Sequence, residues 1–178
     1  MRFLLSFLLF GSWCIGHAQL YTLKDPAKDS LGIQLLYDSL PLMCDSFYLT
    51  FSREKSADLK KFVPDVKYLK ATFDTLAIVY REEQVVYRQQ VLLRQLQKDY
   101  KCILKLAKSE KIKLDKLQKG LTKYNYGEDA KGNEYSYITV TCTYRKKVFE
   151  LKYLAIMLNG KWFVGDELLL ERIEWEAL

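Results

Sequence analysis

The spacing of apolar residues changes near Lys116 from steps of three and four to steps of two. Between residues 135 and 144 the two alternating sets differ in chemistry. The first set is apolar and the second consists of threonines: Ile138, Val140, Cys142 and Tyr144, against Thr139, Thr141 and Thr143. Because side chains alternate along a strand, this pattern predicts an antiparallel sheet with one face covered and one face in water.

Two hairpins are predicted within the C-terminal part, where strands are expected over 117–126, 135–144, 148–158 and 161–171. Asn159-Gly160 is typical of a two-residue type I′ turn, in which both central residues need a positive φ. A second turn is predicted at Lys146-Lys147. The resulting pairs are Met157 with Trp162, Ala155 with Val164, Tyr144 with Phe149, and Cys142 with Leu151. Both registers keep the apolar residues on one face, which a slip of one residue would destroy.

Three helices are predicted before the strands. Ser39 and Pro41 are suited to the start of a helix over 40–52, and Pro64-Asp65 open a second. A third helix runs over 82–109, and its apolar side is predicted to contain Val86, Leu93, Leu96, Tyr100, Ile103, Leu104 and Ala107. The predicted class is therefore α+β, with about three N-terminal helices packed on a curved antiparallel meander of three to four strands.

The N-terminus has the three parts of an export signal. Arg2 is followed by an apolar run over 3–15 and by small residues at Gly16 and Ala18. The run is shorter than the roughly 20 apolar residues that span a bilayer. We expect a cleavable signal peptide over 1–18, cut after Ala18, and a single domain over 19–178 that is periplasmic or secreted and has no stable membrane span. A buried N-terminal helix, an uncleaved anchor and lipid attachment at Cys14 are the alternatives.

Removal of residues 1–18 would restrict the chemistry available to the domain. His17 is the sole histidine, so histidine-based catalysis and histidine-ligated zinc are excluded from the mature chain. Three cysteines remain without a CxxC motif, namely Cys44, Cys102 and Cys142, and we expect no metal site and no cofactor. The formal charge falls by one from +6. A mildly basic exported protein is not expected to bind nucleic acid.

Asp166 is the polar residue that strict alternation places on the buried face of the last strand, opposite Tyr153. The pair predicts a ligand pocket in which Asp166 is a base and Tyr153 a hydrogen-bond partner. Gly165 favours an alternative, because a β-bulge there would turn Asp166 outward and send Leu168 to the core.

Two surface features are candidates for contact with a partner. Lysines at helical spacing form either a docking patch for an anionic partner or a solvated outer face; they are Lys98, Lys101, Lys105 and Lys108. Four tyrosines near the turn over 127–134 form either a rim for a glycan or peptide or ordinary strand packing. They are Tyr124, Tyr126, Tyr135 and Tyr137.

The segment Asn159-Gly160-Lys161-Trp162, followed by an apolar strand, resembles the C-terminal hairpin of small exported bacterial proteins of unknown function. The same hairpin is common in exported domains of the NTF2-like, cystatin-like superfamily. The resemblance covers about residues 40–172 and implies helices packed into a strongly bent sheet. That superfamily includes enzymes, ligand binders and inert partner domains, so the fold alone assigns no activity.

The functional prediction is an exported, non-catalytic binding or accessory domain for a protein or a small ligand. One alternative is an enzyme that uses carboxylate or tyrosine chemistry in an NTF2-like pocket. The other is an inhibitor-like protein that acts through an exposed loop over 127–132.

Overall fold

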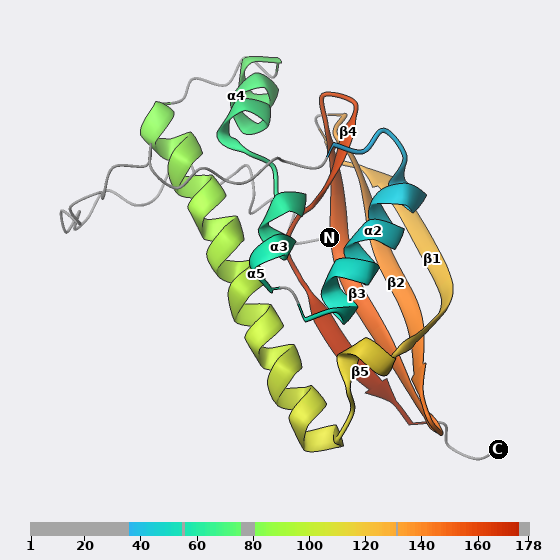
Figure 1. Ribbon diagram of the computed structural model, residues 1–178. Helices are drawn as coiled ribbons and strands as arrows, with labels where there is room; N and C mark the ends of the chain where they lie inside the picture. The colour runs from blue at the N-terminus through green and yellow to red at the C-terminus, as the bar shows by residue number, and fades with distance from the viewer. Residues whose placement is uncertain (1–35, 55, 76–80, 131, 175–178) are drawn as a thin grey trace. The chain divides into compact units, whose positions relative to one another are not determined.

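The computed structural model describes four stretches of the chain, residues 36–54, 56–75, 81–130 and 132–174 (Figure 1). All of these residues belong to one compact unit. The predicted signal peptide and its cleavage after Ala18 lie outside the described residues.

Helix α2 (Leu40–Ser52) has the predicted bounds. Pro41 is suited to its first turn, where the missing N–H would have no intrahelical partner. The Phe47 ring packs on the Tyr153 ring of the sheet with centroids 4.7 Å apart, and the Phe51 ring meets Tyr100 edge-on at 5.9 Å. Helix α2 therefore joins the sheet to the longest helix, with a buried side made by Leu40, Met43, Cys44, Phe47, Tyr48 and Phe51.

Three short helical segments follow: α3 (Ser56–Leu59), the 3-10 turn η2 (Lys60–Phe62) and α4 (Val66–Thr75). Phe62 packs between two rings, stacked on Tyr37 at 5.9 Å and edge-on to Phe47 at 5.3 Å. The Asp65 carboxylate accepts the Tyr68 N–H at 3.0 Å and so satisfies a backbone donor in the first turn of α4. This predicted helix start is confirmed.

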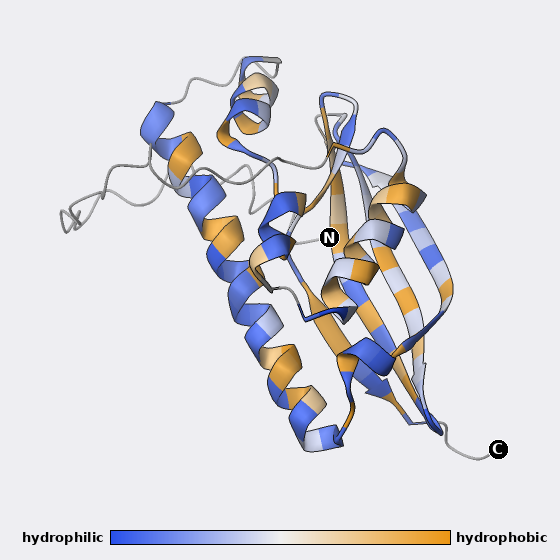
Figure 2. Cartoon of the chain, viewed as in Figure 1, coloured by the Kyte–Doolittle hydropathy of each residue, from blue (hydrophilic) through white to orange (hydrophobic). Residues whose placement is uncertain are grey.

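Helix α5 (Glu82–Glu110) has 29 residues and is about 43 Å long at 1.5 Å per residue. Its buried side consists of Val85, Gln89, Leu92, Leu96, Tyr100, Ile103 and Ala107. The predicted apolar side was wrong at three positions, because Val86 and Leu93 are half-buried and Leu104 is exposed. Figure 2 shows how apolar and polar residues alternate along this helix.

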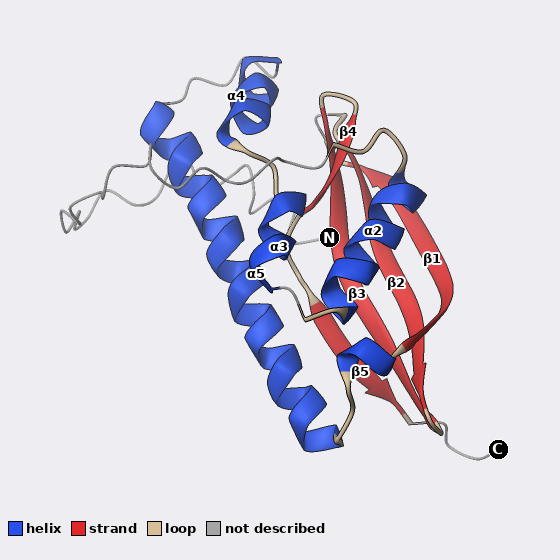
Figure 3. Cartoon of the chain, in the orientation of Figure 1, coloured by secondary structure: helices blue, strands red, loops and turns tan. Residues whose placement is uncertain are grey.

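The C-terminal part forms a five-stranded antiparallel sheet (Figure 3). Its strands are β1 (Gln118–Glu128), β2 (Glu134–Tyr144), β3 (Lys147–Leu158), β4 (Lys161–Val164) and β5 (Leu169–Ile173). The order is β1-β2-β3-β4, and β5 continues along the same edge of β3 beyond β4. The α+β class and the meander are confirmed, whereas the single strand predicted over 161–171 is divided into β4 and β5.

The two hairpin turns differ in how well the sequence predicts them. Asn159 and Gly160 have φ values of 52° and 71°, and the predicted pairing of Ala155 with Val164 is confirmed. The other turn places Arg145 at φ 56°, so that the β2–β3 pairing moves by two residues from the predicted register. A shift by two keeps every side chain on its expected face. The observed pairs there are Tyr144 with Lys147 and Cys142 with Phe149.

The two faces of the sheet match the predicted alternation. On the α2 side, Ile138, Val140 and Cys142 of β2 are buried. On the other side the intervening threonines are half-buried. Burial of a large apolar side chain contributes about 1.5–3 kcal/mol, so the α2 side supplies most of the stabilising contacts of the sheet.

Candidate functional site

A groove of about 400 Å³ lies where α5 passes the connection between β4 and β5. Its volume is within the usual range for small-molecule sites, about 300–1,000 Å³. Polar side chains from α5, from two strands and from the β4–β5 connection line it, including Gln95, Asp99, Tyr137, Thr139, Lys152 and Glu167. The groove thus brings together segments that lie far apart in the sequence.

The β4–β5 connection shapes one wall of the groove. The Gly165 N–H donates to the Leu154 carbonyl at 2.8 Å, and the Leu154 N–H donates to the Asp166 carbonyl at 3.2 Å. Glu167 then adopts a φ of 65°, in the left-handed region that side chains other than glycine seldom occupy. This turn leaves Glu167 exposed and sends Leu168 into the core, where the predicted alternative of a β-bulge at Gly165 also placed Leu168.

Tyr153 borders the groove, but its ring lies on the α2 side of the sheet. Successive side chains point to opposite faces, so Lys152 faces the groove side while the Tyr153 ring packs on Phe47. The Tyr153 hydroxyl is buried and has no hydrogen-bond partner within the described part of the chain. Asp166 is half-buried and is not among the residues that line the groove. The structure therefore does not bring Tyr153 and Asp166 together in one pocket.

Two carboxylates line the end of the groove, those of Asp99 and Glu167, and the half-buried Asp166 precedes Glu167 in the β4–β5 connection. Burial raises the pKa of all three, although the charge of Lys98 lowers that of Asp99. The charge of Asp99 raises the pKa of Asp166 further, and the charges of Asp166 and Asp99 raise that of Glu167. The Gln95 amide donates to the Asp99 carboxylate at 2.8 Å, which fixes its position on α5. Asp99 and Asp166 thus disfavour ionisation of Glu167, and a cation placed at this end of the groove would favour the ionised form.

Lys152 does not neutralise these carboxylates. Its ammonium lies 2.8 Å from the Glu171 carboxylate and 3.0 Å from the Glu150 carboxylate, and these two hydrogen bonds raise its pKa. None of the ion pairs found among the described residues includes Asp99, Asp166 or Glu167. The groove therefore has one wall where the Lys152 charge is paired, and one wall, which we call the acidic wall, where the Asp99 and Glu167 carboxylates form no ion pair with other described residues.

The spacing of the acidic groups does not suit a bound metal ion. Across the described ranges, no three His, Cys, Asp or Glu side chains lie close enough together to hold one. The two buried thiols are also poor metal ligands. Metals bind the thiolate form, and burial raises the pKa of Cys44 and of Cys142 to about 11. The acidic wall can instead accept hydrogen bonds or pair with an organic cation.

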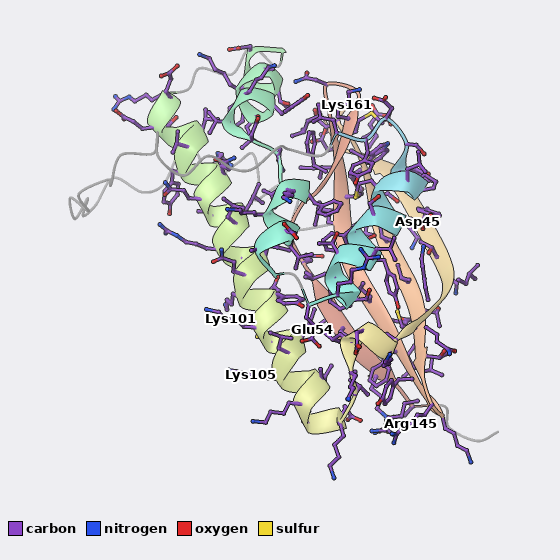
Figure 4. All side chains as sticks on the ribbon, viewed as in Figure 1. Asp45, Glu54, Lys101, Lys105, Arg145 and Lys161 are labelled. Carbon is purple, nitrogen blue, oxygen red and sulfur yellow. The ribbon has the colours of Figure 1, made fainter. Side chains whose placement is uncertain are left out.

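The predicted lysine row lies on the exposed side of α5. All four members are exposed, and Figure 4 shows Lys101 and Lys105 on the side of the helix away from the sheet. The ion pairs that residues 81–110 form with other described residues involve Glu82 and Glu110, and none of them includes these four lysines. Cys102, which is also exposed, lies among these lysines. None of the four lysines lines the groove, which α5 meets through Gln95 and Asp99, but the charge of Lys98 partly offsets the rise that burial causes in the pKa of Asp99.

The four tyrosines near the 127–134 turn do not form one rim. Tyr124 and Tyr126 stack at 6.3 Å, and their partners in β2 are Ile138 and Ser136. Tyr135 and Tyr137 instead belong to the alternate set of β2 side chains, on the opposite face, and meet edge-on at 5.7 Å. Only the second pair contributes to the groove, through Tyr137.

No family model, no curated protein and no solved structure matches this sequence. The resemblance of the C-terminal hairpin to the NTF2-like superfamily therefore stays a prediction. Among the helices that the structure describes, none combines the length and the apolar character needed to cross a bilayer.

The sequence interpretation did not identify Gln95, Asp99 and Glu167 as groove residues. One signal was present, since Asp99 is the sole acidic residue between Gln84 and Ser109 of α5. An isolated acid on a basic helix is a candidate for a specific contact. Its neighbour across the groove, Glu167, lies 68 positions away in the sequence, so their proximity depends on the tertiary fold.

Proposed function

We propose that the protein is an exported, non-catalytic binding domain whose groove holds a small ligand with a positively charged amine. The single observation that carries this proposal is the acidic wall of the groove. The Asp99 and Glu167 carboxylates form no ion pair among the described residues. Burial raises the pKa of Asp99, although the charge of Lys98 lowers it. Burial and the charges of Asp166 and Asp99 raise the pKa of Glu167. A bound cation would relieve this repulsion, because an opposite charge within about 4–6 Å favours the ionised form of a carboxylate.

Tyr137 provides a second element of recognition. The phenol is partly exposed at the groove, and burial followed by the charge of Glu167 raises its pKa. Its ring therefore lies within electrostatic reach of the acidic wall. An aromatic face beside carboxylates is a common arrangement for ammonium groups, since the ring quadrupole attracts a cation by about 0.5–2 kcal/mol.

A calorimetric titration of the full chain tests the groove as a cation site. The probe is 1,4-diaminobutane, with glycerol as the neutral comparison and acetate as the anionic one. We expect saturable binding of the diamine alone and about tenfold weaker binding by Glu167→Gln. The matched control is Glu174→Gln, which removes an exposed carboxylate that does not line the groove. Equal affinity of the diamine and glycerol would contradict the proposal.

An enzyme is the second candidate, supported by the raised pKa values of the groove carboxylates Asp99 and Glu167, since raised values are common in catalytic sites. The phenol of Tyr153 does not contribute to this candidate, because burial keeps its pKa far above the ordinary value and the ring faces the core. Turnover of a bound amine, with a bell-shaped or sigmoidal pH profile that Glu167→Gln abolishes, would favour the enzyme over the binding domain.

The inhibitor-like alternative depends on the β1–β2 turn. The Asp129 carboxylate accepts the Asn133 N–H and the Asn133 side-chain amide, both at 2.9 Å, and Gly132 adopts a φ of 81°. These contacts hold the ends of the turn. Inhibition of a protease by the full chain, lost on Asp129→Ala, would support this reading over the groove.

Export is the remaining component of the proposal and has its own test. Mass spectrometry of the protein recovered from the extracytoplasmic fraction is expected to show a chain that begins at Gln19. A chain that retains residues 1–18 in the cytoplasmic fraction would contradict export and leave the proposed binding site unaffected.

A further inference from the structure

The outward side of α5 carries a continuous row of basic residues, which we call the basic stripe. It consists of Arg94, Lys98, Lys101, Lys105 and Lys108, all exposed. At 100° per residue, these side chains fall within about 80° of arc around the helix, opposite the buried side that contains Leu96 and Ile103. The stripe thus occupies the part of α5 that points most directly to solvent.

The composition of α5 distinguishes the basic stripe from an ordinary solvated helix face. Exposed helices usually intersperse acidic and basic residues, which then pair at i,i+4. Between Gln84 and Ser109 the one acid is Asp99, and it is turned toward the groove. No stripe residue forms an ion pair with any other described residue. Apart from the electrostatic effect of Lys98 on Asp99, the positive charge of the stripe is therefore not balanced within the described fold.

The geometry of the stripe indicates an extended anionic surface. From Arg94 to Lys108 the helix rises about 21 Å at 1.5 Å per residue, with a basic side chain at nearly every turn. Charges spread along a straight line cannot converge on one phosphate or one carboxylate. Four of the five residues are lysines, which lack the fork geometry that arginine uses to pair with a fixed carboxylate.

On the N-terminal side of the basic stripe, the same side of α5 is apolar. Tyr87 and Val91 are 62% and 42% exposed, and they lie within about 20° of Lys98 around the helix. Tyrosine is enriched at the boundary between lipid headgroups and acyl chains, because its ring is apolar and its hydroxyl is polar. A basic row continued by an exposed Tyr and Val matches the chemistry of that boundary.

We infer that the basic stripe docks the protein on the surface of an anionic phospholipid bilayer, with α5 parallel to the membrane plane. This site is separate from the groove, since Asp99 lies about 100° around the helix from Lys98. Electrostatic attraction of this kind amounts to about a fivefold change in partitioning per basic residue near the surface. It acts over roughly a Debye length, about 8 Å at physiological ionic strength.

Sedimentation of the full chain with vesicles tests the inference. The vesicles contain phosphatidylcholine alone or phosphatidylcholine with 30% phosphatidylglycerol. We expect binding to the anionic vesicles that falls steeply between 50 and 300 mM salt. The triple variant Lys98→Gln, Lys101→Gln, Lys105→Gln is expected to partition roughly 10- to 100-fold more weakly. Lys108 is kept because a cation in the last turn stabilises the helix.

The matched control is Lys67→Gln, Lys123→Gln, Lys146→Gln, which removes the same charge from three exposed lysines elsewhere. This variant is expected to keep anionic-vesicle binding within about threefold. The apolar run over residues 3–15 is present in every variant and carries no charge, so any lipid binding through it would be the same for the two triple variants. Equal loss in both triple variants, or binding to polyglutamate without binding to anionic vesicles, would overturn the inference.

Discussion

The two solvent-reaching sides of α5 carry opposite charges. On one side, Asp99 is held by Gln95 and faces the acidic wall of the groove. On the other, the basic stripe has no paired residue among those described. Because the acidic and basic residues lie on different sides of one helix and do not alternate along it, we infer that the two sides bind partners in different ways. The groove depends on the positions of a few atoms, whereas the stripe depends on the sum of its charges.

The largest expected effect concerns the buried side that supports both surfaces. Ile103→Ala should lower the free energy of unfolding by about 3 kcal/mol, because the truncation leaves a cavity in the core between α5 and its neighbours. Urea denaturation measures this change. Leu104→Ala, at an adjacent position that is 37% exposed, should cost less than about 1 kcal/mol. Similar costs for the two variants would show that α5 packs with a different face.

The next effect separates the two surfaces. Asp99→Asn should weaken diamine binding by about tenfold, because it removes one carboxylate from the acidic wall. It should leave anionic-vesicle binding within about threefold of the wild type. The stripe triple variant is expected to show the reverse pattern in the same calorimetric and sedimentation measurements. Loss of both activities in Asp99→Asn would mean that the two sides act as one site.

The pH dependence of stability distinguishes the β4–β5 connection from the C-terminal end of α5. Burial raises the pKa of Asp166, so the folded state binds the carboxyl proton more tightly than the unfolded state does. The stability that Asp166 contributes therefore falls as pH rises above the ordinary value of 3.8. Asp166→Asn should therefore gain stability relative to the wild type as pH rises from 4 toward the raised pKa. Urea unfolding at several pH values measures this trend.

Glu110, the last residue of α5, provides the comparison of opposite sign. The Lys147 ammonium hydrogen-bonds to its carboxylate at 2.7 Å and lowers its pKa below the ordinary value of 4.5. The stability that ionised Glu110 gains from Lys147 is present above pH 4.5 and is lost as pH falls through the lowered pKa. Glu110→Gln should thus lose stability relative to the wild type as pH rises toward 4.5. The same direction of change in both variants would contradict the proposed environments.

The smallest expected effect tests whether the stripe acts through charge alone. Lys98→Arg, Lys101→Arg, Lys105→Arg should keep anionic-vesicle binding within about threefold, because the number of positive charges is unchanged. In the groove, by contrast, Glu167→Asp should weaken diamine binding severalfold although it also keeps the charge. A stripe that fails on arginine substitution would instead recognise its partner through directed contacts.

The fold was predictable where short-range chemistry determines it. Asn159-Gly160 specifies a two-residue turn, and the pairing of Ala155 with Val164 follows. The other turn was placed one residue too late because Arg145 adopts φ 56°, a conformation that its side chain does not signal. On α5, the adjacent pairs Val85-Val86 and Leu92-Leu93 leave the apolar face ambiguous. Contacts with α2, such as Tyr100 on Phe51, settle it.

The candidate site was less predictable because it is made by tertiary contacts. Strict alternation selected Asp166, but the left-handed φ of Glu167 ends the alternation and makes Glu167 the groove residue. Alternation correctly placed Tyr153 on the apolar face covered by the helices, but that face is filled there by the Phe47 ring, so Tyr153 does not open into a pocket with Asp166. The lysine row was visible from helical spacing alone, because one element contains all of it.

The exposed thiol of Cys102 offers a built-in reporter position. The other two described cysteines are shielded, and burial raises the pKa of Cys44 and Cys142 to about 11, which keeps them in the unreactive thiol form. A maleimide dye or a nitroxide added to the folded protein should therefore attach, among these three, at Cys102. It would then report depth and mobility from within the basic stripe without any engineered substitution.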